Sequence, residues 1–212
     1  MHARSNPLSE ETQEKLNQLI KYWWVGDRTY LALQAACQGD DAMPGFADYF
    51  HLLGIRCRVQ AELTTKYLTL RGGVLKMDTC GPIEVPQGTR DGMKQFLEKS
   101  LEIEETIEQS LKETWAAANE TQDIDLMYHI GKKMMRHQTR AIYWALRNIT
   151  GLETSNSAYL YDRLTMRPLV EKMMRGICAH RHSKWGAMMM QIMSPDERTL
   201  MEQEETEVRR CQ

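Results

Sequence analysis

Four long stretches of this chain carry apolar side chains three and four residues apart, and a long connection separates the second stretch from the third. Residues at this spacing lie on one face of an α-helix, and such a helix is stable when that face is buried against other helices. The pattern therefore predicts an all-α fold, a bundle of four helices over about 9–38, 44–71, 89–119 and 121–149.

The ends of the first two predicted helices carry start and stop signals. Ser9 can accept a hydrogen bond from the first turn of its helix, and Gly72 and Gly73 follow the second helix as a C-cap. Residues 74–88 then lack helical periodicity and contain two glycines and two prolines. Antiparallel neighbours need only a short loop, so this long crossover loop predicts a third helix that runs parallel to the second.

After the fourth helix, which we expect Gly151 to end, the sequence predicts a short fifth helix over about 157–166. We expect Pro168 to interrupt it, because proline cannot continue a regular helix. The chain is therefore expected to divide into a bundle domain over 1–167 and a helical, methionine-rich C-terminal extension over 168–212.

Charge and cysteine content exclude several classes of protein. A net charge of -2 with mixed signs gives no electrostatic reason to expect nucleic acid or an anionic membrane as a partner. Five cysteines without C-x-x-C spacing favour a reducing compartment over a disulfide framework or a zinc site. No apolar run approaches the roughly 18 residues of a membrane span, and the first residues lack the apolar core of a secretory signal. We expect a cytoplasmic location.

The candidate chemical site consists of five positions that fall at one depth of the predicted bundle: Trp23, Cys57, Gln60, Glu104 and Gln138. Helical bundles hold paired metal ions at such a depth through several carboxylates and Glu-x-x-His pairs. Hard cations need charged oxygen ligands, and a single carboxylate remains here. The sequence thus predicts the frame of a two-metal site without the negative charge to hold two ions.

Several local strings resemble the ferritin family over about residues 9–167. They lie in the second to fifth predicted helices: Phe46-Ala47-Asp48-Tyr49-Phe50 with Arg71-Gly72-Gly73, Leu101-Glu102-Ile103-Glu104 with Gln109-Ser110-Leu111, Gln138-Thr139-Arg140-Ala141-Ile142, and Tyr159-Leu160-Tyr161-Asp162-Arg163. The helix order and the crossover also match. The resemblance implies a ferritin-like bundle that assembles into a hollow 24-subunit shell, which oxidises ferrous iron and stores it as a ferric mineral.

The resemblance also assigns roles to the core positions. The ferroxidase glutamate of the family's first helix falls on Trp23, and the Glu-x-x-His of the second helix falls on Cys57 and Gln60. These three are not competent iron ligands, whereas Glu104 and Gln138 keep the family's residues and are the residual metal positions. Trp23 is expected to fill the volume of the missing ions. Iron, if it binds there, is expected to bind weakly.

Two further iron devices of the family are altered. The cavity-face acids on which light-type subunits nucleate mineral fall on Leu52, Ile55, Arg56 and Val59. The acids of the threefold entry pore fall on Tyr128 and Gly131. The resemblance therefore implies a subunit that has lost three separate means of handling iron.

Two interpretations of Glu104 stay open. It is a residual metal ligand, or a buried acid hydrogen-bonded to Gln138, Gln60 or a tyrosine, since buried polar groups find partners. The leading hypothesis for the chain is a ferritin-family cage subunit in iron storage and homeostasis, structural or light-type rather than enzymatic, in a shell that can include a catalytically active subunit. The alternatives are a non-iron cage similar to artemin, a ferritin relative, that acts as a stress chaperone, and a weak ferroxidase with one iron on Glu104.

The second predicted helix has an additional apolar stripe, formed by Leu52, Ile55, Val59 and Leu63. A helix with two apolar faces must be covered twice. We expect the methionine-rich extension to pack on this stripe and to occupy the lumen of the shell. Its last helix is expected to begin at Ser194 and to be charged on most faces.

Overall fold

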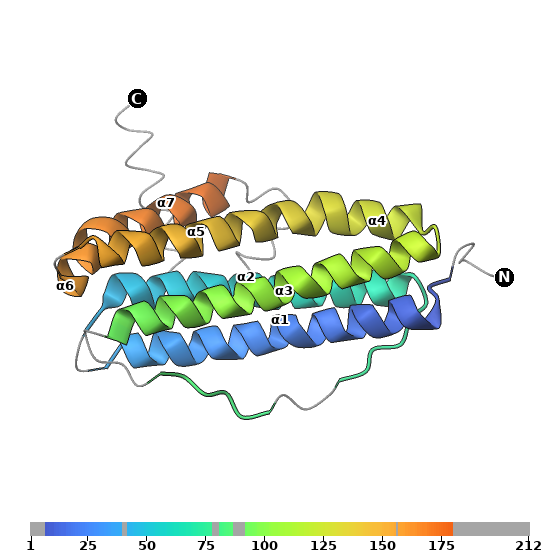
Figure 1. The fold of residues 1–212 in the computed structure, drawn as a ribbon, viewed down its shortest axis with the longest axis horizontal. Coiled ribbons are helices and arrows are strands. Elements are labelled where there is room, and N and C mark those ends of the chain that lie inside the picture. The colour runs from blue at the N-terminus through green and yellow to red at the C-terminus, as the bar shows by residue number, and fades with distance from the viewer. Residues whose placement is uncertain (1–6, 40–41, 78–80, 87–91, 156, 180–212) are drawn as a thin grey trace.

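The computed structural model describes residues 7–39, 42–77, 81–86, 92–155 and 157–179, and within these ranges it contains helices and no strand. Three long helices, α1 (Glu10–Cys37), α2 (Pro44–Leu70) and α3 (Met93–Glu120), lie side by side with a fourth rod. That rod joins α4 (Ile124–Ile130), the π-helical turn η2 (Gly131–Met135) and α5 (Arg136–Glu153) (Figure 1). The predicted all-α, ferritin-like four-helix architecture is confirmed.

The predicted limits of the first two helices agree closely with the structure. The Ser9 hydroxyl accepts a hydrogen bond from the Thr12 backbone N–H at 3.1 Å, which caps α1. The second helix begins at Pro44, and after Arg71 the chain turns at Gly72 with a φ of 88°. Glycine adopts this left-handed conformation without steric cost, so it closes α2 as the sequence predicts.

The connection after α2 is a crossover. Figure 1 shows it returning along the length of the bundle beside α1, so that α3 runs in the same direction as α2, as predicted. The buried Asn17 of α1 holds its first residues: the Asn17 side-chain amide donates to the Val74 carbonyl at 3.0 Å, and its oxygen accepts from the Lys76 N–H at 2.7 Å.

The expectation that Gly151 ends the fourth helix is wrong, because α5 continues to Glu153. A Cβ atom on Gly151 would lie only 2.6 Å from the hydroxyl oxygen of Tyr161. The glycine is therefore required for close packing of the chain that follows, and it does not act as a helix stop.

The expectation that Pro168 interrupts the fifth helix is also wrong. The chain continues through α6 (Ala158–Tyr161), the π-helical turn η3 (Asp162–Met166) and α7 (Arg167–Ala179). Proline has no N–H to donate to the carbonyl four residues earlier, and its ring collides with that carbonyl in a regular α-helix. The wider π-helical turn η3, which ends two residues before Pro168, departs from that spacing, so the helix passes the proline.

The helix α7 packs against α2, and its Val170 is buried in the common core. Leu52, Ile55 and Val59 of the additional α2 stripe are also buried. The described start of the extension thus contacts α2, and its packing on the Leu52 stripe remains a prediction. Residues 180–212, which include the predicted helix from Ser194, lie outside the described residues, and a position in a lumen remains a prediction.

The turn η3 also completes the start of α2. Met43, at the N-cap of α2, offers no side-chain hydrogen bond, and the Phe46 N–H instead donates to the Asp162 carboxylate at 2.7 Å. Backbone approaches closely here, since a Cβ on Gly45 would lie 2.8 Å from the Asp162 carbonyl oxygen. A buried acid from the π-helical turn η3 therefore supplies the missing cap.

Candidate metal centre

Glu104 lies in the middle of α3 with 1% of its surface exposed, and three side chains donate hydrogen bonds to its carboxylate. The Tyr30 hydroxyl donates to Oε1 at 2.5 Å, and the Gln138 amide donates to Oε2 at 2.7 Å. Arg56 Nη2 lies 2.6 Å from Oε1 and 2.5 Å from Oε2. Both carboxylate oxygens are thus bonded, with Tyr30 and Gln138 as two partners of the kinds that the sequence allows.

The sequence interpretation missed the role of Arg56. It placed Arg56 on a cavity face with Leu52, but the structure turns the guanidinium inward, where 13% of the side chain is exposed. Burial acts to lower the pKa of Arg56, and the charge of Glu104 more than offsets this, so the pKa lies above its ordinary value. The only signal in the sequence is a lone acid on an apolar face, which requires a buried partner.

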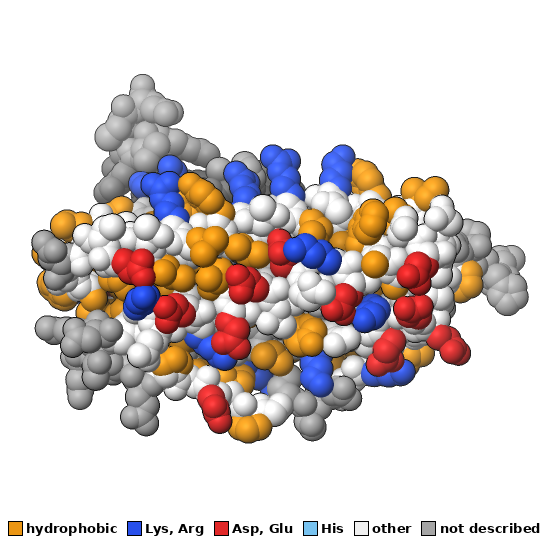
Figure 2. Space-filling model, viewed as in Figure 1, with side chains coloured by type: hydrophobic (Ala, Val, Ile, Leu, Met, Phe, Trp, Pro, Cys, Tyr) orange, Lys and Arg blue, Asp and Glu red, His pale blue; other side chains and the backbone are white. Residues whose placement is uncertain are grey.

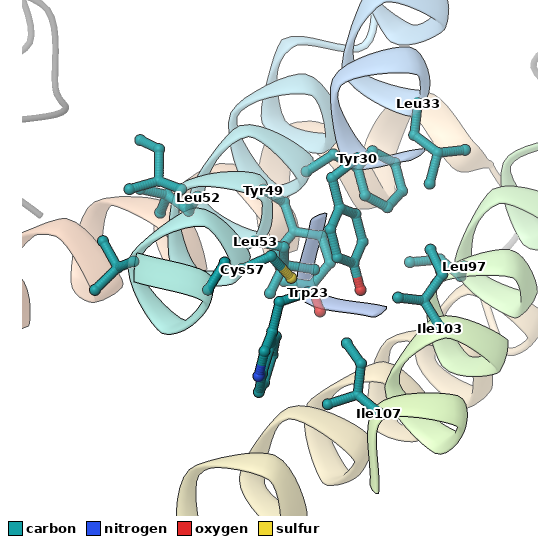
Figure 3. Packing of buried hydrophobic residues seen from close by; sticks show 14 of the residues in the cluster. Trp23, Tyr30, Leu33, Tyr49, Leu52, Leu53, Cys57, Leu97, Ile103 and Ile107 are labelled. Carbon is teal, nitrogen blue, oxygen red and sulfur yellow. The ribbon is translucent and has the colours of Figure 1, made fainter. Parts of the chain in front are cut away.

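Trp23 and Cys57 line the space beside this ion pair. Figure 3 shows both side chains directed between the helices, with Ile103 and Ile107 of α3 across from them. The Arg56 guanidinium carbon lies 5.8 Å from the centre of the Trp23 ring, within the range of a cation–π interaction. Burial raises the pKa of Cys57 to about 12, so its thiol stays protonated and behaves as a small apolar group.

Tyr30 and Gln138 fix the orientation of Glu104. The Gln138 amide also donates to the backbone carbonyl of Glu104 at 2.7 Å, and the Tyr30 hydroxyl lies 3.1 Å from the Ser100 hydroxyl. Burial raises the pKa of Tyr30 well above its ordinary value, and the Glu104 charge raises it further. The phenol therefore remains a hydrogen-bond donor to the carboxylate.

Gln60, the fifth predicted position, lies outside this network. It lines a cavity of about 150 Å³ between α2 and α5, together with Arg56, His137 and Met173. Burial lowers the pKa of His137, and the nearby Arg56 lowers it further. The cavity thus opens beside the guanidinium and brings another basic side chain towards it.

The polar atoms left over at this centre are poorly suited to a cation. Among the described side chains, Trp23 Nε1, Arg56 Nε and Gln138 Oε1 are buried without a hydrogen-bond partner. Two of the three are N–H donors, which cannot coordinate a metal ion. Within the described ranges no three His, Cys, Asp or Glu side chains gather where they could hold one. The donor set around Glu104 fits a guanidinium and does not fit a pair of iron ions.

The positions that correspond to the family's pore are also on the surface. Tyr128 is 53% exposed on α4, and its ring contacts Lys132. Gly131, in η2, has open space where a Cβ would stand. Neither brings a carboxylate to the surface of the rod.

The sequence profile of the ferritin-like domain matches residues 13–154, which include the whole of the centre described above. The chain belongs to the ferritin family. This ferritin chain is 26% identical over 140 residues to Ferritin-3, chloroplastic, of Arabidopsis thaliana. The aligned region covers 63% of this chain and 53% of that protein, so the ferritin chain spans about half the length of this relative.

The name of the plant relative bears on the expected location. That protein is chloroplastic, so a cytoplasmic location for this ferritin chain remains a prediction. Among the helices that the structure describes, none has the length and apolar character to cross a membrane. The family match supports the fold and the family assignment of the chain.

Proposed function

We propose that this chain is a structural subunit of a ferritin shell, active in iron storage and homeostasis without oxidising iron at its own centre. The observation that carries this proposal is the pairing of Arg56 with Glu104. A guanidinium cannot lose its proton in a protein, so it is a permanent positive charge. The Arg56 guanidinium forms an ion pair with Glu104, the single carboxylate that is kept from the family's ligand set.

Electrostatics supports this function. A ferrous ion about 4 Å from the guanidinium would be repelled by roughly 8 kcal/mol at an effective dielectric constant near 20. Glu104 cannot compensate, because its charge is already matched by Arg56 at 2.5 Å. Two ferrous ions would be repelled by the same guanidinium. They would also lack oxygen ligands, since Trp23 and Cys57 offer none.

The proposal extends to assembly. Family membership supports an oligomeric cage, and the retained bundle supports the 24-subunit form expected from the resemblance. We infer that the chain joins shells in which other subunits oxidise iron. Iron is then the cargo of the shell, and the bound pair of Glu104 and Gln138 is a relic of the ligand set.

Oxygen consumption by the purified homopolymer tests the proposal. Ferrous iron is added to the homopolymer, to a catalytically active ferritin, and to shells in which the two are co-assembled. The native mass and the iron content of each particle are measured in parallel. We expect no oxygen uptake above the buffer rate for the homopolymer, and mineral formation in the mixed shell.

Three outcomes would contradict the proposal in different ways. Oxygen uptake by the homopolymer that Glu104→Ala abolishes would indicate a weak ferroxidase. Failure to enter a shell with the active subunit would exclude the mixed particle. A homopolymer that takes up no iron but suppresses aggregation of a heated client protein would favour the artemin-like chaperone.

A further inference from the structure

The rod formed by α4, η2 and α5 carries basic side chains and no acidic ones over most of its length. Between Asp125 and Glu153 the sequence contains no acidic residue, although the chain as a whole has a net charge of -2. The basic residues of this stretch, all exposed, form what we call the basic face: Lys132, Lys133, Arg136, Arg140 and Arg147. Figure 2 shows Lys and Arg side chains in a row along the upper edge, over α7 and over the rod of α4 and α5, whereas acidic side chains gather lower, over α3.

The charges of the basic face are not compensated by the described part of the chain. Within it, none of the five makes an ion pair with a carboxylate. Two of them contact aromatic rings instead: Lys132 lies 5.0 Å from the Tyr128 ring, and Arg147 lies 5.4 Å from the Trp144 ring. Like charges four residues apart destabilise a helix, so this face favours an anionic partner.

The path of α7 brings the chain to the basic face. In α6, before α7 begins, the Tyr161 hydroxyl donates to Asn148 at 3.3 Å. Further along the chain, Met173 of α7 lines a cavity with four residues of α5: His137, Arg140, Ala141 and Trp144. Later residues of this part of the chain therefore contact earlier residues of α5. Figure 1 shows that α7 and α5 are antiparallel. At that pace Ala179, where α7 ends, comes level with the first half of α5, which carries Arg136 and Arg140.

The sequence beyond Ala179 contains a segment of opposite charge. Residues 196–207 hold six acids and one basic residue, a net charge of -5 (6 minus 1): Asp196, Glu197, Glu202, Glu204, Glu205 and Glu207 against Arg198. The sequence predicts a helix here, which at 1.5 Å per residue would span about 18 Å, against about 22 Å from Lys132 to Arg147. The intervening residues 180–195 reach roughly 50 Å when extended, which is ample.

We propose that the acidic segment, residues 196–207, binds in cis to the basic face of α4 and α5. The six carboxylates face the five cations, and the pairing is electrostatic and sensitive to salt. The C-terminal extension is then not wholly an apolar filler. Its methionine-rich part follows α7, and its acidic part covers the rod beside α7.

Disulfide trapping tests the contact in the full-length chain. Cys80, Cys178 and Cys211 are changed to serine, while the buried Cys37 and Cys57 are kept. Gln203→Cys is then combined with Thr139→Cys at the basic face, or with Gln109→Cys on the exposed side of α3 as the control. Both partner positions are exposed and uncharged, so only their location differs.

We expect the 139–203 disulfide to form at least tenfold faster than the 109–203 disulfide, within one chain, and to slow to the control rate in 0.5 M salt. Arg136→Glu with Arg140→Glu should remove the preference. Equal rates for the two pairs would overturn the proposal. Disulfides that link two chains of different tagged mass would assign the partner to a second copy and would equally overturn the cis contact.

A binding measurement separates an internal partner from an external polyanion. Inorganic polyphosphate is titrated into the unmodified protein and into a full-length variant with Glu202, Glu204, Glu205 and Glu207 changed to glutamine. We expect the variant to bind at least tenfold more tightly, because its basic face is no longer covered. Equally tight binding by both proteins would show that the face is open, which would contradict the proposal.

Discussion

The guanidinium of Arg56 and the carboxylate of Glu104 are 2.5 Å apart, in a core where the carboxylate has almost no contact with solvent. Removing one partner leaves the other as an unpaired buried charge, which typically costs about 3–5 kcal/mol. We expect Arg56→Met or Glu104→Gln alone to lower the free energy of unfolding by an amount of this order, measured with denaturant. The double variant should recover much of the loss, and strictly additive losses would contradict this.

Restoring iron chemistry should require removal of Arg56. Trp23→Glu, Cys57→Glu and Gln60→His together return the expected ligand types, but the guanidinium would pair with the new carboxylates. We expect ferrous-iron-dependent oxygen uptake to be clearly higher when Arg56→Ala is added to these three changes. Arg56→Ala by itself is the control and should show none. Equal uptake by the triple and quadruple variants would mean that Arg56 is not the obstacle.

Two helical glycines of the same rod should respond oppositely to alanine. At Gly151 a Cβ would lie 2.6 Å from the Tyr161 hydroxyl and 3.0 Å from its ring, so Gly151→Ala should cost about 1–3 kcal/mol of stability. At Gly131 nothing lies within 4 Å, so Gly131→Ala should stabilise by about 0.4–1 kcal/mol. Thermal unfolding of the two variants gives the comparison. A destabilised Gly131→Ala would contradict the account.

His129 should make stability fall in mild acid. Its ring stacks on Tyr67 at 4.1 Å; burial lowers its pKa to about 4, and Lys133 lowers it as well. The unfolded chain takes up a proton near pH 6.5 that the folded chain excludes until about pH 4. Stability is therefore lost as the pH falls across this window, by roughly 2–3 kcal/mol from this group.

The control for this pH dependence is His129→Phe, which keeps the ring stack on Tyr67 and removes the titration. Denaturant midpoints of the two proteins are measured from pH 7 to pH 4, and the midpoint of the unmodified protein should fall relative to that of the variant as the pH falls. Parallel curves would indicate that His129 does not contribute.

The ends of α1 and α2 and the crossover follow from the sequence because they depend on local rules. Ser9 caps its own helix, Gly72 adopts the conformation that glycine favours, and a loop as long as 74–88 needs a distant helix start. Gly151 and Pro168 do not end their helices, although local sequence rules predict that they would, and the reason is the packing around them. The approach of Tyr161 requires a glycine inside a helix, and a π-helical turn accommodates the proline.

The candidate centre was predictable in its frame and unpredictable in its content. Glu104 and Gln138 meet as their positions on facing helices imply. Arg56 is adjacent in sequence to the inward-facing Cys57, and helical geometry alone turns it about 100° away. The long side chain of Arg56 still reaches Glu104 from that position. A pattern of apolar positions does not predict the direction in which a long arginine side chain extends.

The hydrogen bond from Phe46 to Asp162 joins residues that are 116 positions apart. A ribosome makes the first turn of α2 long before it makes the acid that caps it. Until Asp162 has emerged, the nascent bundle keeps an unclosed helix start among apolar side chains. The start of the second helix is therefore capped only when the chain has been made as far as Asp162. A chain that ends before Asp162 keeps the Phe46 N–H without this acceptor.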